Sequence, residues 1–198
     1  MLTNCLNILN EGGNIAPLNH TYVALIPKVE KPRQVTEFRP INLCNVIYRI
    51  ITKTIANRLK HMLHNIISQT QSAFILGRLI ANNVVIGYKC LHKIRLNKEE
   101  KKGLVALKLD ISKAYDRIKW GFLENVMKRL GFSPKWIDLI MRCISTVSFS
   151  ILINGAAKGM IHSHRGLRQG CPLSRYLFIF YAEGFSNLFQ QVECQKLI

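Results

Sequence analysis

Between Leu43 and Ile67, apolar residues recur every three or four positions, which is the spacing of one face of an α-helix. The pattern predicts one long amphipathic helix, whose remaining positions make a basic outer face that includes Arg49, Lys53, Arg58, Lys60 and His61. A second helix is predicted from about Arg78 to Asn97. The charged run Lys98–Lys102, closed by Gly103, then predicts a solvated turn at a subdomain boundary.

Upstream, residues 1–20 have the pattern of a helix that ends at Gly12 and Gly13 and is followed by a loop. This pattern indicates an N-terminal leader that begins inside a larger unit. Thr21–Ile26 is predicted as a short strand. Residues 27–40 are predicted as a polar loop, because three prolines separate its basic side chains.

Downstream, strand and helix patterns follow one another. The apolar run Leu104–Leu109 is predicted as a strand that ends at Asp110. Residues 120–130 are predicted as a helix closed by Gly131, and Ser133-Pro134 is typical of the start of the next helix.

The last third of the chain has a hairpin pattern and an apolar helix pattern. Residues 147–153 largely alternate between apolar and polar side chains, so they are predicted as a strand. Asn154-Gly155 favours a tight turn, with a return strand towards Ser163. The strongly apolar run from Pro172 to about Gln191 is predicted as a buried helix.

Composition adds a strong positive charge to this mixed pattern. The 198 residues include 28 Lys and Arg against 11 Asp and Glu, a net charge of +17, and 48% are hydrophobic. That hydrophobic content is ample for the core of one domain, or of one domain and part of another. The charge indicates a phosphate backbone as the partner, with a membrane surface as the rival.

Two further observations concern the cellular compartment of the protein and the chemical state of its cysteines. No apolar run reaches about 18 residues and no basic leader precedes an apolar block, so we expect an intracellular protein without a membrane span. The six cysteines form no Cys-x-x-Cys pair and lie mostly in apolar runs, as reduced core thiols do. We expect neither disulfides nor zinc, and we expect His61, His64, His162 and His164 to be surface or phosphate-facing residues.

Asp110 is one of only three aspartates, and it follows an apolar run in a chain rich in lysine and arginine. A carboxylate at a strand end can bind Mg²⁺, the carbonyl of Ile111 can add a second oxygen, and Tyr115 can form the floor of a sugar pocket. The alternative is that Asp110 caps the following turn and Tyr115 lies in the core.

The loop 165–174, RGLRQGCPLS, is the second candidate segment, and it opens onto the last apolar helix. Its two glycines allow a substrate to approach the backbone closely, and the Gln169 side chain can hydrogen-bond a base. Pro172 suits the first turn of a helix. The alternative is an ordinary loop and helix start.

Together these segments resemble the reverse transcriptases of non-LTR (LINE-type) retrotransposons, of the kind abundant in plants. LKLDISKAYDRIKW resembles the family's motif A, and GLRQGCPLSRYLF its motif B. ALIPK and EFRPINLCNVIYRIITKTIANRL resemble finger motifs 1 and 2, and QSAFILGRLIANNVV resembles the segment between fingers and palm. The segments follow the family's order over nearly the whole chain.

The resemblance implies an α+β right-hand polymerase fold, with helix-rich fingers over residues 21–103 and an incomplete palm over residues 104–198. It implies an RNA template, a DNA primer and deoxynucleoside triphosphates as partners, and a pair of Mg²⁺ (or Mn²⁺) ions as cofactors. It also implies action in the nucleus.

The resemblance assigns roles to individual residues. Asp110 would be the catalytic metal ligand, helped by the backbone carbonyl of Ile111. Substrate and template contacts would come from Lys28, Arg39, Tyr115, Arg168, Gln169 and Gly170. Lys28 and Arg39 would meet the triphosphate, although both could equally be solvated loop charges. Tyr115 would contact the sugar, and Gln169 with Gly170 would line the pocket of the nascent base pair.

The chain also departs from the family pattern. In motif B, Cys171 stands where the family usually has an aspartate, and Arg175 stands where it has a proline. Motif C, an Asp-Asp hairpin, is missing. Glu183 in the segment YAEG imitates that motif, but its place in the apolar run predicts that it belongs to the last helix.

Asp110 is then the one credible carboxylate ligand, because Asp116 suits an ion pair with Arg117 or Lys119 better than a shared metal. We therefore expect a palm truncated before motif C and little or no polymerase activity from this chain alone. The alternatives are a non-catalytic basic module that binds RNA or hybrid duplex, and a decaying product that does not fold stably.

Overall fold

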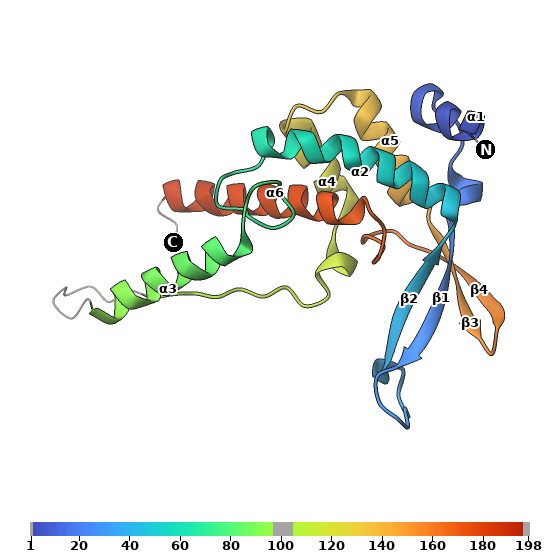
Figure 1. The fold of residues 1–198 in the computed structure, drawn as a ribbon, viewed down its shortest axis with the longest axis horizontal. Helices are drawn as coiled ribbons and strands as arrows, with labels where there is room; N and C mark the ends of the chain where they lie inside the picture. The colour runs from blue at the N-terminus through green and yellow to red at the C-terminus, as the bar shows by residue number, and fades with distance from the viewer. Residues whose placement is uncertain (1, 97–104, 196–198) are drawn as a thin grey trace.

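The computed structural model describes residues 2–96 and 105–195. A four-stranded sheet has the order β2-β1-β3-β4, with β1 over His20–Pro27, β2 over Phe38–Cys44, β3 over Ser148–Ile153 and β4 over Ala156–His162. β1 pairs antiparallel with β2 and parallel with β3, and β3 pairs antiparallel with β4. In Figure 1 the two hairpins extend away from a body of helices. The sheet thus joins strands from distant parts of the sequence.

Turn chemistry explains the hairpin of β3 and β4. Asn154 and Gly155 have φ angles of 50° and 79°, the two left-handed residues that a two-residue turn requires. Both predicted strands and their turn are confirmed.

The hairpin of β1 and β2 differs from the prediction at β2. This strand begins at Phe38, so the predicted loop 27–40 is too long and the predicted helix 43–67 starts too early. β2 lies at an edge of the sheet, where a proline such as Pro40 is tolerated. The helix that follows starts after Asn45, whose Oδ1 accepts a hydrogen bond of 2.8 Å from the amide of Ile47.

The helices form the body of the molecule. The α-helices of the described ranges are α1 (Leu2–Leu6), α2 (Val46–Ile66), α3 (Ile80–Leu96), α4 (Trp120–Arg129), α5 (Pro134–Ser145) and α6 (Ser174–Cys194). Shorter turns are the π-helix η1 (Asn7–Glu11) and the 3-10 helices η2 (Ala16–Leu18), η3 (Val35–Glu37) and η4 (Ala114–Arg117). The apolar faces of α2, α4, α5 and α6 share one core that includes Ile55, Leu59, Leu123, Met127, Ile140, Leu177 and Phe180. The expected mixed α and β content is therefore present.

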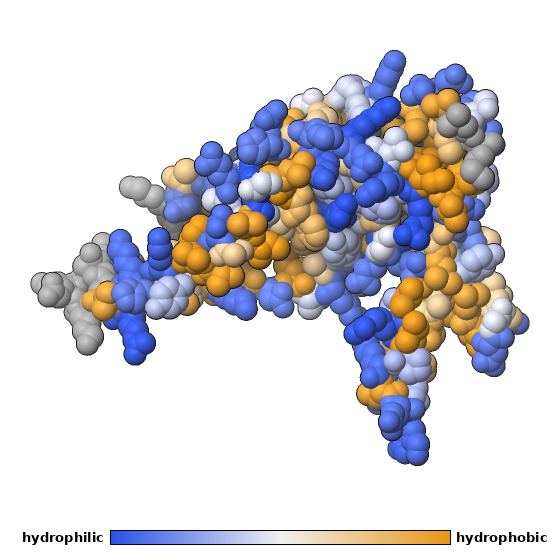
Figure 2. Space-filling view, viewed as in Figure 1, coloured by the Kyte–Doolittle hydropathy of each residue, from blue (hydrophilic) through white to orange (hydrophobic). Residues whose placement is uncertain are grey.

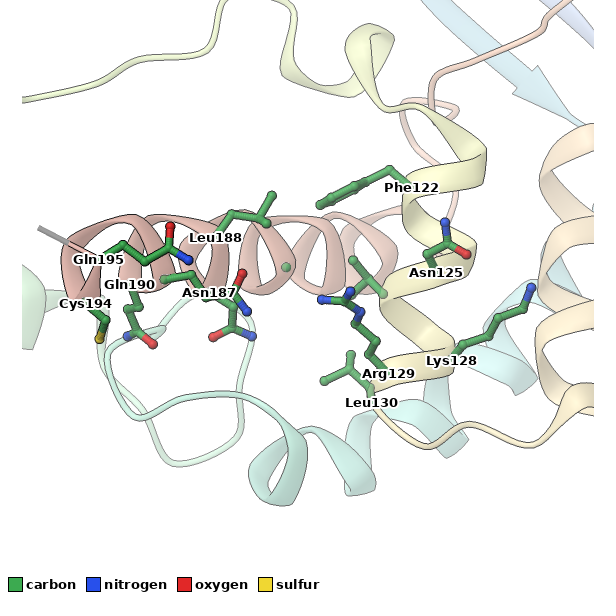
Figure 3. Close-up of a pocket in the computed structure, with 13 residues that line it drawn as sticks. Phe122, Asn125, Lys128, Arg129, Leu130, Asn187, Leu188, Gln190, Cys194 and Gln195 are labelled. Atoms are coloured by element: carbon green, nitrogen blue, oxygen red, sulfur yellow. The ribbon is translucent and has the colours of Figure 1, made fainter. Parts of the chain in front are cut away.

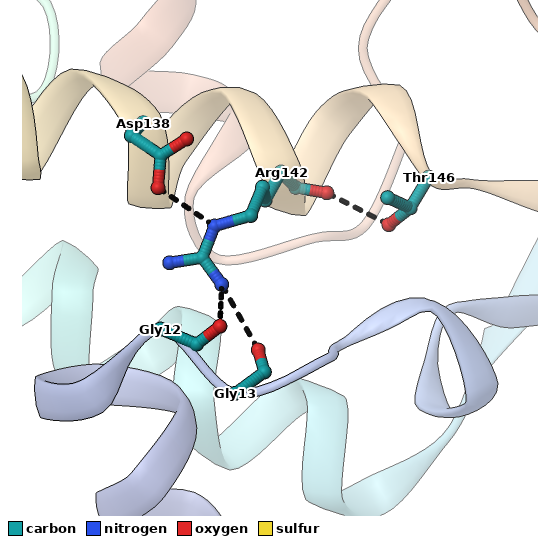
Figure 4. Close-up of polar contacts among 5 residues, drawn as sticks. All are labelled: Gly12, Gly13, Asp138, Arg142 and Thr146. Atoms are coloured by element: carbon teal, nitrogen blue, oxygen red, sulfur yellow. Dashed lines mark hydrogen bonds and ion pairs between the residues drawn. The ribbon is translucent and has the colours of Figure 1, made fainter.

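The N-terminal segment is hydrogen-bonded to α5. Gly12, with φ of 79°, ends the first helical stretch as predicted. The Arg142 guanidinium donates from Nη1 to the carbonyls of Gly12 and Gly13, both at 2.9 Å, and from Nε to Asp138 at 2.9 Å (Figure 4). One side chain thereby satisfies two carbonyls at the end of that stretch.

The predicted strand before Asp110 is wrong for the residues that the structure describes. Residues 105–110 have no regular secondary structure, and Val105, Leu107 and Leu109 are exposed. A strand exists only where a neighbour completes its hydrogen bonds, and the described residues place no strand beside this segment. The predicted turn at 98–103 lies outside the described residues.

The last helix is buried only along its first half. α6 is buried at Tyr176, Leu177, Ile179 and Phe180, whereas Phe185, Leu188 and Phe189 are exposed. Glu183 lies within this helix, as predicted, and is buried. Its carboxylate accepts hydrogen bonds from the amide of Ser68 at 3.2 Å and from the Ser68 hydroxyl at 3.0 Å. Glu183 therefore anchors the loop after α2 instead of facing a substrate.

Among the helices of the described ranges, none combines the length and apolar character needed to cross a bilayer. The cysteines are all free thiols. The expectation of core positions is confirmed for Cys5, Cys143 and Cys171, and it is wrong for Cys90 and Cys194, which are exposed. Cys90 is exposed because it lies on α3, of which no residue is buried.

Candidate active site

A cavity of about 860 Å³ lies where the β1–β2 hairpin, η4, α5 and the loop 163–174 meet. Its walls include four of the predicted substrate contacts, which are Lys28, Tyr115, Arg168 and Gln169. Asp116 and Asn42 also line it. Segments separated by more than a hundred residues in sequence thus bring predicted site residues to one place.

Two elements of the site are held together by backbone hydrogen bonds. The amide of Gly166 donates to the carbonyl of Ile118 at 2.8 Å, and the amide of Leu167 donates to the carbonyl of Tyr115 at 2.8 Å. The indole Nε1 of Trp120 donates to the carbonyl of Gly166 at 2.7 Å. The segment that resembles motif A and the loop that resembles motif B are therefore hydrogen-bonded directly to each other.

At Gly166 the backbones of these two segments approach each other closely. Its φ of 89° is left-handed, and a Cβ placed there would lie 3.2 Å from Asp116 Cα and 3.2 Å from the carbonyl oxygen of Tyr115. Both neighbours are backbone atoms, so neither can move aside cheaply. The position combines a conformational and a steric reason for glycine.

We expect Gly166→Ala to lower the free energy of unfolding by about 2–3 kcal/mol, because left-handed strain and a backbone clash add together. Gly170→Ala is the matched control, since Gly170 has a φ of 83° but nothing within 4 Å of its Cβ position. It should lose only the strain, about 1 kcal/mol. Urea unfolding measures both variants, and equal losses would contradict a steric role for Gly166.

Tyr115 forms part of the cavity wall while also contacting the core. Its ring stacks on Phe178, with ring centroids 5.2 Å apart and planes 7° from parallel. Partial burial raises the pKa of the Tyr115 hydroxyl, and the positive charge of Arg175 opposes that rise. The phenol therefore stays neutral at pH 7, as a rigid and partly apolar surface.

Arg168 is held from inside the protein. It is buried, and its Nη2 donates to both the carbonyl and the side-chain Oδ1 of Asn19. Its Nη1 lies 3.3 Å from the sulfur of Cys44, and its guanidinium carbon lies 4.5 Å from the ring centroid of Tyr48. With these contacts Arg168 positions the loop, and its contact with substrate stays a prediction. Asn42 Nδ2 donates to the carbonyl of Gln169 at 3.2 Å, which fixes the next residue.

Cys171, at the position where the motif usually has an acid, is buried and also lines the cavity. Its Sγ lies 4.0 Å from the hydroxyl of Tyr48, which donates to the carbonyl of Cys143 at 3.0 Å. Burial raises the pKa of Tyr48 well above its ordinary value and raises the pKa of Cys143 to about 12. The Tyr48 hydroxyl and the Cys143 thiol are therefore neutral at pH 7.

The remaining predicted residues do not line the cavity. Asp110 and Ile111 are exposed on the segment before η4, Arg39 is exposed on β2, and Gly170 is exposed beside Gln169. Of the two residues expected to meet the triphosphate, Lys28 therefore lines the cavity and Arg39 does not. The Lys28 Nζ donates to the carbonyl of Thr36 at 2.9 Å.

Asp116 corrects one expectation. Within residues 2–96 and 105–195, no ion pair joins its carboxylate to Arg117 or Lys119. Asp116 sits in the 3-10 turn η4, which follows the left-handed Lys113, and it lines the cavity. Sequence reasoning also missed Asn19, Asn42 and Tyr48, whose roles depend on distant partners.

Metal ligands are sparse in this region. In the part of the chain that the structure describes, no group of three His, Cys, Asp or Glu side chains could hold an ion. The four histidines expected at the surface, His61, His64, His162 and His164, are exposed.

A second cavity, of about 900 Å³, lies between α4 and α6 (Figure 3). Phe122, Leu130 and Leu188 supply apolar walls, and Asn187 and Arg129 supply polar ones. None of the predicted site residues lines it.

Comparison with known proteins supplies the family. The model of the family described as reverse transcriptase (RNA-dependent DNA polymerase) matches residues 26–197. The chain is 31% identical to the transposon TX1 uncharacterized 149 kDa protein of Xenopus laevis over 85% of its own length and 13% of that protein. It is 27% identical to the Pol polyprotein from the type-1 retrotransposable element R2 of Popillia japonica, over 78% of the chain and 21% of that protein.

A third relative is an uncharacterized mitochondrial protein of Arabidopsis thaliana, which is 50% identical over 44 residues, or 22% of the chain and 36% of that protein. The chain therefore spans well under half the length of each of these relatives. The family match, by contrast, covers most of the chain, and it includes both segments that build the cavity. The chain belongs to the reverse transcriptase family, as a reverse transcriptase domain of the non-LTR retrotransposon type.

Proposed function

We propose that this chain supplies the nucleotide and template contacts for RNA-directed DNA synthesis. In that reaction a primer 3′-hydroxyl attacks the α-phosphate of a deoxynucleoside triphosphate, and pyrophosphate leaves. The observation that carries the proposal is the cavity in which Lys28, Tyr115 and Gln169 meet. A cation, an aromatic face and an amide are suited to a triphosphate, a sugar and a base, respectively.

The proposal includes a right-hand polymerase fold, with fingers over residues 21–103 and palm over residues 104–198. The supporting observation is that the cavity lies between these two parts, with Lys28 and Asn42 from one and Tyr115 and Gln169 from the other. The two parts also share a sheet, since β1 pairs with β3. An RNA template, a DNA primer and action in the nucleus complete the proposal.

Asp110 and the carbonyl of Ile111 would hold a Mg²⁺ or Mn²⁺ ion. Both residues are exposed, and Mg²⁺ takes one or two carboxylates while keeping several waters. Such ions supply activation of the primer hydroxyl and neutralisation of the leaving pyrophosphate. A pair of ions needs more carboxylates than the described residues bring together. We therefore infer that the polypeptide alone binds template and does not extend a primer.

Primer extension on an RNA template tests this inference. We expect no Mg²⁺-dependent product from the 198-residue polypeptide, while a retroviral reverse transcriptase run in parallel extends the same primer. Fluorescence anisotropy should meanwhile show hybrid-duplex binding that weakens steeply with salt, because the net charge is +17. Processive extension that Asp110→Ala abolishes would refute the inference of inactivity.

A non-catalytic module that binds RNA or hybrid duplex is the second candidate. The excess of Lys and Arg over Asp and Glu favours it. Duplex binding that persists undiminished in Asp110→Ala and Lys28→Ala is its expected signature. If instead Lys28→Ala removes triphosphate binding, measured by competition with a labelled nucleotide, the cavity acts as a nucleotide site.

A further inference from the structure

Helix α3 presents a mixed aromatic and basic stripe that the nucleotide cavity does not use. None of its residues is buried, and Tyr88 is 70% exposed. In Figure 1 it extends away from the other helices, and Figure 2 shows apolar side chains gathered near its beginning. Residues four and seven positions apart share a helix face, so Tyr88, His92 and Arg95 form one stripe.

Two rings of this stripe are already arranged as a platform. The rings of Tyr88 and His92 are stacked, with centroids 6.1 Å apart and planes 25° from parallel. Stacked exposed rings suit a nucleobase, because every base has a flat face that can continue the stack. Arg95, one turn further along, can add a guanidinium plane or a phosphate contact.

The charges around the stripe all have one sign. α3 carries Lys89, Lys93 and Arg95 and contains no Asp or Glu. Lys89 and Lys93 are four residues apart, so their repulsion slightly destabilises the helix on its own. An anionic partner would relieve that repulsion. The stripe therefore combines base-stacking rings with a flanking row of cations.

We propose that α3 binds a single-stranded nucleic acid, with bases on Tyr88 and His92 and phosphates on Lys89, Lys93 and Arg95. This rests on the proposed function, since it gives a nucleic-acid polymerase domain a second contact for unpaired strand. The same face also exposes Val84 and Leu91, so a membrane surface is the competing partner. His92 and Arg95 interrupt that apolar face, which favours a nucleic acid over the continuous apolar face of an interfacial helix.

Anisotropy with a labelled oligouridine, long enough for one site of roughly 4 to 16 nucleotides, tests the proposal on the whole chain. Tyr88→Leu keeps bulk but removes the ring, so single-strand affinity should fall roughly 5- to 150-fold. Tyr88→Phe keeps the ring and should stay within about twofold of the original chain. Phe185→Leu is the matched control, because Phe185 is also an exposed helical aromatic in contact with a second ring, that of Phe189.

The outcomes separate this proposal from the proposed function. Hybrid-duplex binding that survives while Tyr88→Leu leaves single-strand affinity unchanged would overturn the α3 site alone. If the original chain does not bind hybrid duplex, that result would count against the proposed function instead. An α3 site is also refuted if Tyr88→Leu weakens only binding to vesicles rich in anionic phospholipid, or if Phe185→Leu matches its effect on RNA. Circular dichroism of each variant confirms that α3 remains helical.

Discussion

Asn19→Ala should lower the free energy of unfolding by about 3–5 kcal/mol, because it removes one acceptor of a buried guanidinium together with two further hydrogen bonds of the Asn19 side chain. Asn19 is fully buried, and its Oδ1 accepts a hydrogen bond from Arg168. Its Nδ2 donates to the carbonyl of Cys143 at 2.8 Å and to the hydroxyl of Thr146 at 2.9 Å. One small side chain thus connects the segment before β1 with the end of α5 and the candidate site.

Equilibrium unfolding in urea measures this loss, with Asn14→Ala as the control. Asn14 lies five residues upstream, is exposed, and accepts one hydrogen bond of 2.9 Å from the amide of Ala16. That control should cost no more than about 1 kcal/mol. Similar losses for the two variants would show that Arg168 finds other partners and that the network around Asn19 is not essential.

The same network shows why part of the candidate site could not be predicted from the sequence. Gln169 and Tyr115 stand in recognisable motifs, and the structure places both at the cavity. Asn19 and Tyr48 have no local signal, because their roles come from burial against residues more than ninety positions away. For Arg168 the motif position predicts a substrate contact, which stays a prediction, but it gives no signal of the contacts with Asn19, Cys44 and Tyr48.

Fold prediction succeeded where local chemistry decides the structure. Asn154-Gly155 fixes a hairpin turn, and Gly12 ends a helical stretch, whatever the rest of the chain does. Pairing is not local, so the parallel neighbours β1 and β3 had no signal in sequence. The strand predicted from the apolar run before Asp110 is wrong for the same reason, because a strand needs a partner and the described residues provide none.

Gly184→Val should be the most damaging substitution at a helix crossing, with a loss of about 3 kcal/mol. α4 and α6 cross here, and a Cβ on Gly184 would overlap Val126 Cγ2 and lie 3.3 Å from Phe122 Cζ. Helix propensity alone would favour alanine over glycine by up to about 1 kcal/mol. Overlap with two side chains outweighs that gain, so even Gly184→Ala should destabilise, with the larger valine costing more.

A double-mutant cycle separates crowding from other effects at this crossing. Val126→Ala removes the overlapping methyl groups, so Gly184→Ala should cost less in that background than in the original chain. Gly121→Ala on α4 is the control for helix propensity, since nothing lies within 4 Å of its Cβ position and it should be neutral or slightly stabilising. Urea midpoints measure the cycle. Additive losses for Gly184→Ala and Val126→Ala would mean that the two helices separate to admit the methyl group, and that the close crossing is not what requires glycine.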